Sequence, residues 1–143
     1  MASTMLDIDL KNQVGLFLIV SQFGLVFLTF ILYLLGGYNF DEMSTCIALI
    51  VPMVSVYATA FVKYFISNKS VVSRKNIKHT VTWQYAFISF AIPVSFIMFI
   101  GLIIILKPFQ FFGSFENFKG VLLMAESVFG AYIGLIMNSL IET

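Results

Sequence analysis

Long apolar runs separated by short polar segments make up most of the chain. Four such runs approach or exceed the roughly 20 residues that an α-helix needs to cross the hydrocarbon core of a bilayer. We expect no separate soluble domain, because the segments between the runs are short. The pattern therefore predicts an all-α integral membrane four-helix bundle in a single domain, with spans at about residues 14–35, 46–65, 85–106 and 120–141.

The composition favours a membrane protein and argues against other classes. The 143 residues are 60% hydrophobic and only 10% charged, whereas soluble domains carry about 25% charged residues. The net charge of +1 is too small for nucleic-acid binding driven by bulk electrostatics, so we expect no direct nucleic-acid partner. The N-terminus lacks the basic stretch of a cleavable signal peptide, so the first run is expected to remain as an anchor.

Basic residues are concentrated between the second and third runs, in the segment 67–82. This segment has no acidic residue, and the first loop has no Lys or Arg. By the positive-inside rule the segment is cytoplasmic, and with four spans both termini are cytoplasmic too, as in a bacterial inner-membrane protein. The segment either contacts a cytosolic protein or anionic lipid headgroups, or is only a topology signal. Its candidate contact residues are Lys69, Arg74, Lys75 and Lys78.

Small and polar residues recur at helical spacing inside the runs, which favours close contact between helices or subunits. In the first run, such residues spaced by seven share one narrow seam. In the fourth run, Gly130 and Gly134 follow Glu126 at steps of four, all within one third of the helix circumference. The residues expected at the helix or oligomer interface are Gly15, Gln22, Thr29, Ser55, Glu126, Gly130, Gly134 and Asn138.

Two prolines lie near the middle of their runs, Pro52 in the second and Pro93 in the third. Each removes a backbone hydrogen bond and is expected to kink its helix. The kinks either form a gate or a midplane site, as in transporters with broken helices, or are ordinary features of membrane helices.

Glu126 is the only acidic residue inside an apolar run, and no basic residue lies at its depth. An ionised carboxylate there costs a few kcal/mol, so it should be protonated, hydrogen-bonded or in a wet cavity. Candidate partners are Gln22, Thr29 and Asn138, in the same chain or a neighbouring subunit. Three interpretations stay open: a proton or cation site, a voltage- or pH-sensitive switch, or a structural hydrogen bond at a subunit interface.

The segment after the third run is rich in phenylalanine, with five between residues 107 and 118. A free aqueous loop does not expose so much apolar surface. We expect this segment to lie in the membrane interface or to fold over the outer mouth of the bundle.

No pattern of catalytic or metal-binding residues is present. The single histidine, His79, has no other His, Cys or acidic residue nearby, and there is neither a phosphate-binding glycine loop nor a pair of membrane acids. We therefore predict that the protein is not an enzyme and holds no cofactor or metal.

In outline, the chain resembles the four-span membrane component of Kiwa, a bacterial antiviral defence system. The shared features are four spans, cytoplasmic termini and a basic cytoplasmic segment at Lys69–Lys78. The resemblance covers the whole chain as architecture, and no functional residue carries over. It implies a membrane protein that senses infection and works with a cytosolic DNA-binding partner.

The leading hypothesis is a homo-oligomeric inner-membrane protein that senses a membrane event and recruits or signals to a cytosolic protein. Its expected partners are membrane lipids, further copies of itself and that cytosolic protein. The small-residue faces and the basic segment favour it. The alternatives are an ion-conducting pore, or a small proton-coupled transporter. The residues that would line the pore between subunits are Gln22, Thr29, Glu126 and Asn138.

Overall fold

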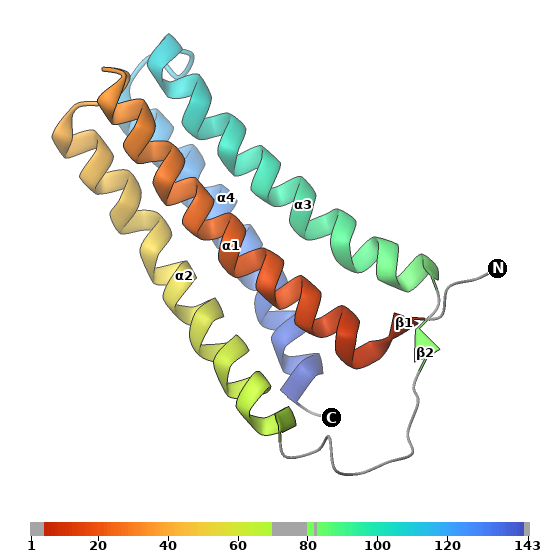
Figure 1. Ribbon diagram of the computed structural model, residues 1–143. Coiled ribbons are helices and arrows are strands. Elements are labelled where there is room, and N and C mark those ends of the chain that lie inside the picture. Colours follow the sequence, from red (N-terminus) through yellow and green to blue (C-terminus); the bar gives the residue numbers. More distant parts are fainter. Residues whose placement is uncertain (1–4, 70–79, 82, 142–143) are drawn as a thin grey trace.

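The described part of the chain forms four long helices and one short strand pair. The structure, a computed structural model, describes residues 5–69, 80–81 and 83–141. The predicted all-α class is confirmed, because the two strands hold only two residues each. In chain order the elements are β1 (Met5–Leu6), α1 (Asp7–Leu34), α2 (Phe40–Lys69), β2 (Thr80–Val81), α3 (Trp83–Leu106), the 3-10 turn η1 (Lys107–Phe109) and α4 (Phe115–Ile141) (Figure 1).

Each helix begins before the apolar run that predicted it. α1 starts at Asp7 and α4 at Phe115, ahead of the predicted runs at 14–35 and 120–141. A helix can continue into the polar interface, where water satisfies its end, and hydrophobicity alone does not mark that boundary.

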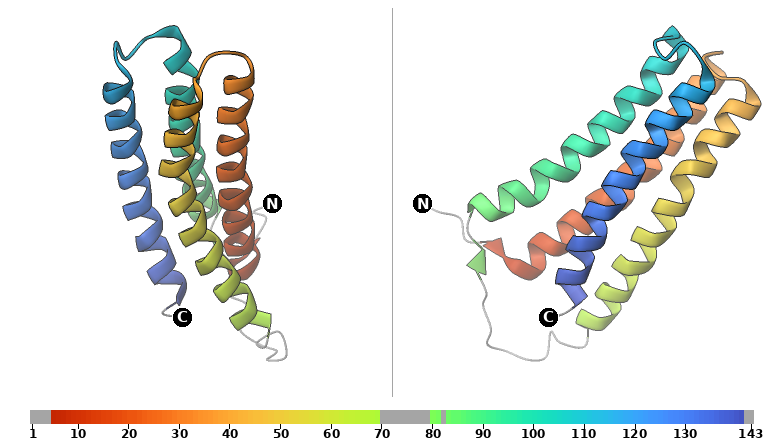
Figure 2. Two further views of the ribbon diagram at one scale, coloured as in Figure 1. Left: turned by 90° about the vertical axis from the view of Figure 1, so that its left-hand side faces the viewer. Right: turned by 180° about the vertical axis from the view of Figure 1, so that it is seen from behind.

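The four helices form an up-and-down bundle in which each helix packs against two neighbours. Around the bundle the order is α1, α2, α4, α3, so α1 and α4 lie diagonally opposite each other. The α1–α2 and α3–α4 connections, residues 35–39 and 107–114, lie together at what we call the hairpin end. At the opposite, terminal end, α3 diverges from α4 (Figures 1 and 2).

The outward surfaces of the helices are apolar. Among the described residues, three helical segments are long and apolar enough to cross a membrane: Asn12–Leu34, Ala86–Phe109 and Phe115–Leu135. A membrane crossing by α2 stays a prediction. Exposed large apolar side chains include Phe23 and Phe27 on α1, Met98 on α3, and Met124 and Val128 on α4. Lipid is the solvent that suits such a surface.

The buried apolar side chains of α2 and α3 lie mostly in the half of the bundle next to the hairpin end, whereas α1 and α4 also carry buried ones toward the terminal end, such as Leu10, Leu18 and Ile133. Among the described side chains of α2, the buried apolar ones lie between Met43 and Val54. On α3 they are Ile100, Ile103 and Ile104 near its end, with Ala86 near its start. A groove of ≈ 660 Å³ runs along the terminal half of α2. It is lined by Ala58, Thr59, Val62, Lys63 and Ile66.

Both helices that contain a proline continue through it. Pro93 is buried in the bundle, whereas Pro52 is exposed on its outer surface. The Ser55 and Ser95 hydroxyls donate to the carbonyl four residues earlier, at 3.1 and 2.7 Å. These are not the carbonyls that the prolines leave without an N–H partner, which precede each proline by four residues. The predicted kinks stay predictions.

Candidate functional site in the bundle interior

Three polar side chains are buried among the residues that the structure describes. They are Gln22 and Thr29 on α1, both 0% exposed, and Glu126 on α4, 2% exposed. On α1 the seven-residue spacing brings Gln22 and Thr29 onto the buried face together with Gly15. The predicted seam of the first run therefore lines the interior of the bundle.

The buried face of α4 is formed mainly by large apolar side chains, with Glu126 at its edge. If Glu126 is taken as the origin at 100° per residue, Phe129 and Ile133 lie about 60° and 20° to one side, and Gly134 about 80° to the other. Phe129 and Ile133 are buried, Gly130 is half-buried and Gly134 is exposed. No described atom lies within 4 Å of where a Cβ on Gly134 would be. The small-residue face is therefore turned away from the core of this chain.

Gln22 and Glu126 lie at nearly the same depth in the bundle. Gln22 precedes the end of α1 at Leu34 by twelve residues, and Glu126 follows the start of α4 at Phe115 by eleven. At 1.5 Å per residue, both lie about 17 Å from the hairpin end. The two residues lie on diagonally opposite helices, and both side chains are buried.

These two side chains lack the hydrogen bonds that burial requires. Both polar atoms of the Gln22 amide and both oxygens of the Glu126 carboxylate have no partner among the described residues. The Thr29 hydroxyl, in contrast, donates to the Leu25 carbonyl at 2.9 Å. The remaining unpaired buried atom, Asn12 Oδ1, lies toward the terminal end. A buried unsatisfied polar group costs about 1–3 kcal/mol, so Gln22 and Glu126, the polar pair, are the candidate site.

The polar pair offers oxygen and amide groups for binding, but no catalytic arrangement. One carboxylate and one amide can hold a proton, a water molecule or a cation. Within the described part of the chain, no group of three His, Cys, Asp or Glu side chains could hold a metal ion. One carboxylate and one amide at the same depth suit the binding of a small polar or charged species.

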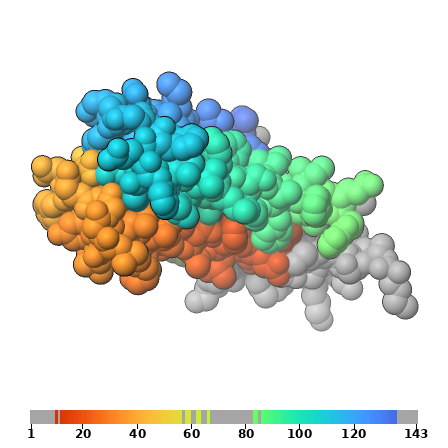
Figure 3. Space-filling model, turned by 90° about the horizontal axis from the view of Figure 1, so that it is seen from above, coloured from red at the N-terminus to blue at the C-terminus, as the bar shows by residue number. Residues whose placement is uncertain are grey.

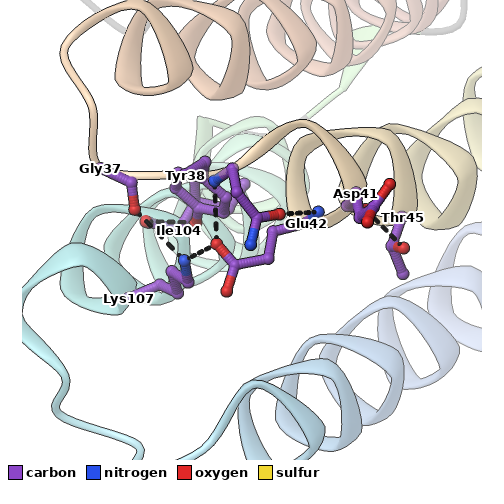
Figure 4. Close-up of polar contacts among 8 residues, drawn as sticks. Gly37, Tyr38, Asp41, Glu42, Thr45, Ile104 and Lys107 are labelled. Carbon is purple, nitrogen blue, oxygen red and sulfur yellow. Dashed lines mark hydrogen bonds and ion pairs between the residues drawn. The ribbon is translucent and has the colours of Figure 1, made fainter.

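The hairpin end holds a second polar group, the hairpin-end cluster of Tyr38, Asn39, Glu42 and Lys107. Figure 4 labels Tyr38, Glu42 and Lys107. The Lys107 ammonium forms an ion pair with Glu42 and donates to the Gly37 carbonyl at 3.2 Å. It also lies 4.5 Å from the centre of the Tyr38 ring. The cluster thus joins the start of α2 to the chain that follows α3.

Asn39 and Glu42 form a reciprocal cap at the start of α2. The Glu42 N–H donates to Asn39 Oδ1 at 2.8 Å, and the Asn39 N–H donates to Glu42 Oε2 at 3.0 Å. This is a capping box, and its signal is visible in the sequence as Asn followed three residues later by Glu. The pairing of Glu42 with Lys107 spans 65 residues, and no local pattern indicates it.

The surroundings favour the ionised form of Glu42 and the neutral form of Tyr38. Burial opposes ionisation of Glu42, but hydrogen bonds from Lys107 and Asn39, with the Lys107 charge, outweigh it, so the Glu42 pKa lies below 4.5. Burial, together with the adjacent Cys46, raises the pKa of the Tyr38 phenol far above its ordinary value. The protonated Tyr38 hydroxyl donates to the Ile104 carbonyl at 2.7 Å.

The phenylalanine-rich segment covers the hairpin-end cluster with part of its side chains. Phe118 is 1% exposed and stacks on Phe115, with ring centres 5.6 Å apart, while Phe112 meets Phe118 edge-on. Phe109 and Phe111 are exposed. In Figure 3, which is seen from above, the surfaces of the regions that connect α1 to α2 and α3 to α4 touch each other. The hairpin end is therefore filled with side chains.

The remaining predicted residues are spread over the molecule. Ser55 is exposed on α2. Lys69 ends α2 and Asn138 lies in the last turns of α4, but their side chains are outside the described part. Arg74, Lys75 and Lys78 lie outside the described residues altogether.

Comparison with protein-family models, curated proteins and solved structures finds no match to this chain.

Proposed function

We propose that this protein senses a change at the membrane and passes it to a cytosolic partner, acting as a homo-oligomer in the bacterial inner membrane. The observation that carries this proposal is the unsatisfied polar pair, which lies inside a bundle whose hairpin end is filled. The resemblance in architecture to the membrane component of an antiviral defence system supports phage infection as the event that is sensed.

The polar pair supports a sensing role because it brings alternative helix arrangements close in energy. Any rearrangement that gives Gln22 or Glu126 a partner gains the hydrogen bonds that the described arrangement lacks. Helix movement costs least where neighbouring helices are least in contact, and α3 diverges from α4 at the terminal end (Figure 2). The basic segment 67–82 connects α2 and α3 at this end, so a change inside the bundle would reach the surface offered to the partner.

The ends of the helices also support the proposed topology. The start of α1, the end of α2, the start of α3 and the end of α4 all lie at the terminal end (Figure 1). With the basic segment 67–82 on the cytoplasmic side, both chain ends are then cytoplasmic.

A second candidate function is conduction or proton-coupled transport between subunits. The exposed position of Gly134, on the face next to Glu126, favours it, because a second copy placed there would bring a carboxylate to the boundary between chains. The filled hairpin end opposes a pore through a single chain.

Two measurements separate these functions. The first is co-purification of the protein from phage-infected cells, with bound proteins identified by mass spectrometry. We expect one stoichiometric soluble partner, lost when Lys69, Arg74, Lys75 and Lys78 are all changed to Gln and kept in the control Lys119→Gln. The same partner on the four-fold variant would overturn recruitment through the basic segment.

The second measurement is ion flux through vesicles that contain the purified protein. We expect no flux above that of empty vesicles. A flux that disappears in Glu126→Gln would instead establish conduction. The native mass of the protein in detergent tests the oligomer, and a monomeric mass would contradict it.

A further inference from the structure

The polar pair has the composition of a binding site for one positive charge. Glu126 supplies two carboxylate oxygens and Gln22 one amide oxygen, and none of them has a hydrogen-bond partner among the described residues. All three are hard oxygen ligands, which suit a proton or an alkali cation better than a soft metal. We propose that the polar pair binds one monovalent cation, either a proton or a sodium ion.

Charge balance selects a single positive charge. An ionised carboxylate about 17 Å inside an apolar helix bundle has an unfavourable free energy. One bound positive charge makes the site neutral and removes this cost. A divalent cation would leave an excess positive charge in the same place. Calcium also takes six to eight oxygen ligands, more than the pair provides.

No other charged residue in the described part of the chain provides this neutralisation. On α4 the nearest charged side chain is Lys119, seven residues away, or about 10 Å along the helix. On α3 the described side chains include no charge, and Lys107 lies beyond its end. The other described titratable side chains on the four helices are Tyr33 on α1, Asp41, Glu42, Cys46 and Lys63 on α2, and Glu116 and Tyr132 on α4.

The two sources of charge use the same atoms in different ways. The two groups share no hydrogen bond in the described arrangement. A proton on Glu126 converts the carboxylate into a donor, for which the Gln22 amide oxygen becomes an acceptor when α1 and α4 move closer. A sodium ion accepts lone pairs from both residues at once. In either case the bound charge draws α1 and α4 toward each other across the bundle.

This inference rests on the proposed function only in taking the polar pair as the sensing site. Binding is measured on the purified protein without any partner. Failure of partner recruitment therefore leaves the cation site standing, and failure of cation binding leaves recruitment to be tested by itself.

The test is thermal unfolding of the protein in detergent micelles, in sodium, potassium or choline chloride at one ionic strength, at neutral and at acid pH. Sodium at constant pH, or acid at constant salt, should raise Tm by about 3–8 °C. The rise should persist in the control Glu116→Gln, which removes an exposed carboxylate from the same helix. It should be absent in Glu126→Gln.

The outcomes identify the ion or reject the site. A response to sodium but not to choline assigns sodium, and a response to acid alone assigns the proton. An equal response in wild type and Glu126→Gln, or no response in wild type, overturns the proposal. If Glu126→Gln does not fold, Gln22→Leu serves instead: we expect sodium-22 binding weakened about 10-fold, or the acid midpoint displaced, by loss of the amide ligand. Unchanged behaviour of Gln22→Leu would remove Gln22 from the site.

Discussion

Two carboxylates in this bundle have opposite surroundings. Glu42, at the hairpin end, pairs with Lys107 and accepts a hydrogen bond from the Asn39 N–H. Glu126, in the middle of α4, is more deeply buried and has no partner among the described residues. This difference indicates that the hairpin end keeps one arrangement, whereas the bundle interior around Glu126 can adopt another. A satisfied network in a low dielectric favours one arrangement, whereas unsatisfied groups leave room for another.

The hairpin-end cluster and the polar pair therefore have separate roles in one molecule. The hairpin end, covered by Phe112, Phe115 and Phe118, holds the two hairpins together. The polar pair lies deeper in the bundle, about 17 Å from the hairpin end, and α3 and α4 separate beyond it at the terminal end. A rigid end combined with an unsatisfied interior directs any helix movement to the terminal end.

The largest expected effect comes from breaking the hairpin-end cluster with Lys107→Ala. This change leaves the Glu42 carboxylate without its cation and the Gly37 carbonyl without its donor. We expect the free energy of unfolding to fall by about 2–3 kcal/mol, measured by reversible unfolding in mixed micelles.

Lys119→Ala is the matched control. Lys119 pairs with Glu116 at 2.9 Å, but the Glu116 side chain is 76% exposed and that of Lys119 38% exposed. Such surface pairs contribute about 0–1 kcal/mol. Equal losses for the two lysine variants would refute the role of Lys107 as the tie between the hairpins.

A smaller effect of opposite sign is expected for Gln22→Leu. Replacing an unpaired amide by an apolar side chain of similar size removes the cost of burying it. In neutral, sodium-free buffer the free energy of unfolding should rise by about 1 kcal/mol. A loss of 1 kcal/mol or more would mean that the amide is satisfied, and that the polar pair does not differ from the hairpin-end cluster.

The smallest effect is a pH dependence specific to Glu42. Its pKa is lowered in the folded protein, so its contribution to stability is present above the ordinary value of 4.5 and is lost as the pH falls through the folded pKa. Wild type should therefore lose more stability than Glu42→Gln as the pH drops below 4.5. Parallel unfolding curves for the two proteins over this range would show that the ion pair contributes nothing.

The sequence predicted the helices well because each apolar run is long and is separated from the next run by a short segment that contains polar residues. It also placed Gln22 and Thr29 on one seam, since a seven-residue repeat changes its direction little along a helix. It did not distinguish the two faces of α4, because large apolar and small residues both suit contact with protein or lipid in a membrane helix. The Glu42–Lys107 pair joins distant parts of the chain, so only the fold reveals it.

The strand pair at the terminal end offers a site for probing and perturbing the start of α3. Met5 and Leu6 pair in antiparallel fashion with Val81 and Thr80, so the beginning of the described chain is fastened to the entry into α3. A spectroscopic probe at Met5 would thus report the position of that entry directly. A bulky fusion protein ahead of Met5 would disturb the pairing of β1 with β2. A fusion protein placed after α4 would instead disturb the end of α4. Comparing the two fusion proteins therefore tests how strongly each end of the chain affects the terminal end of the bundle.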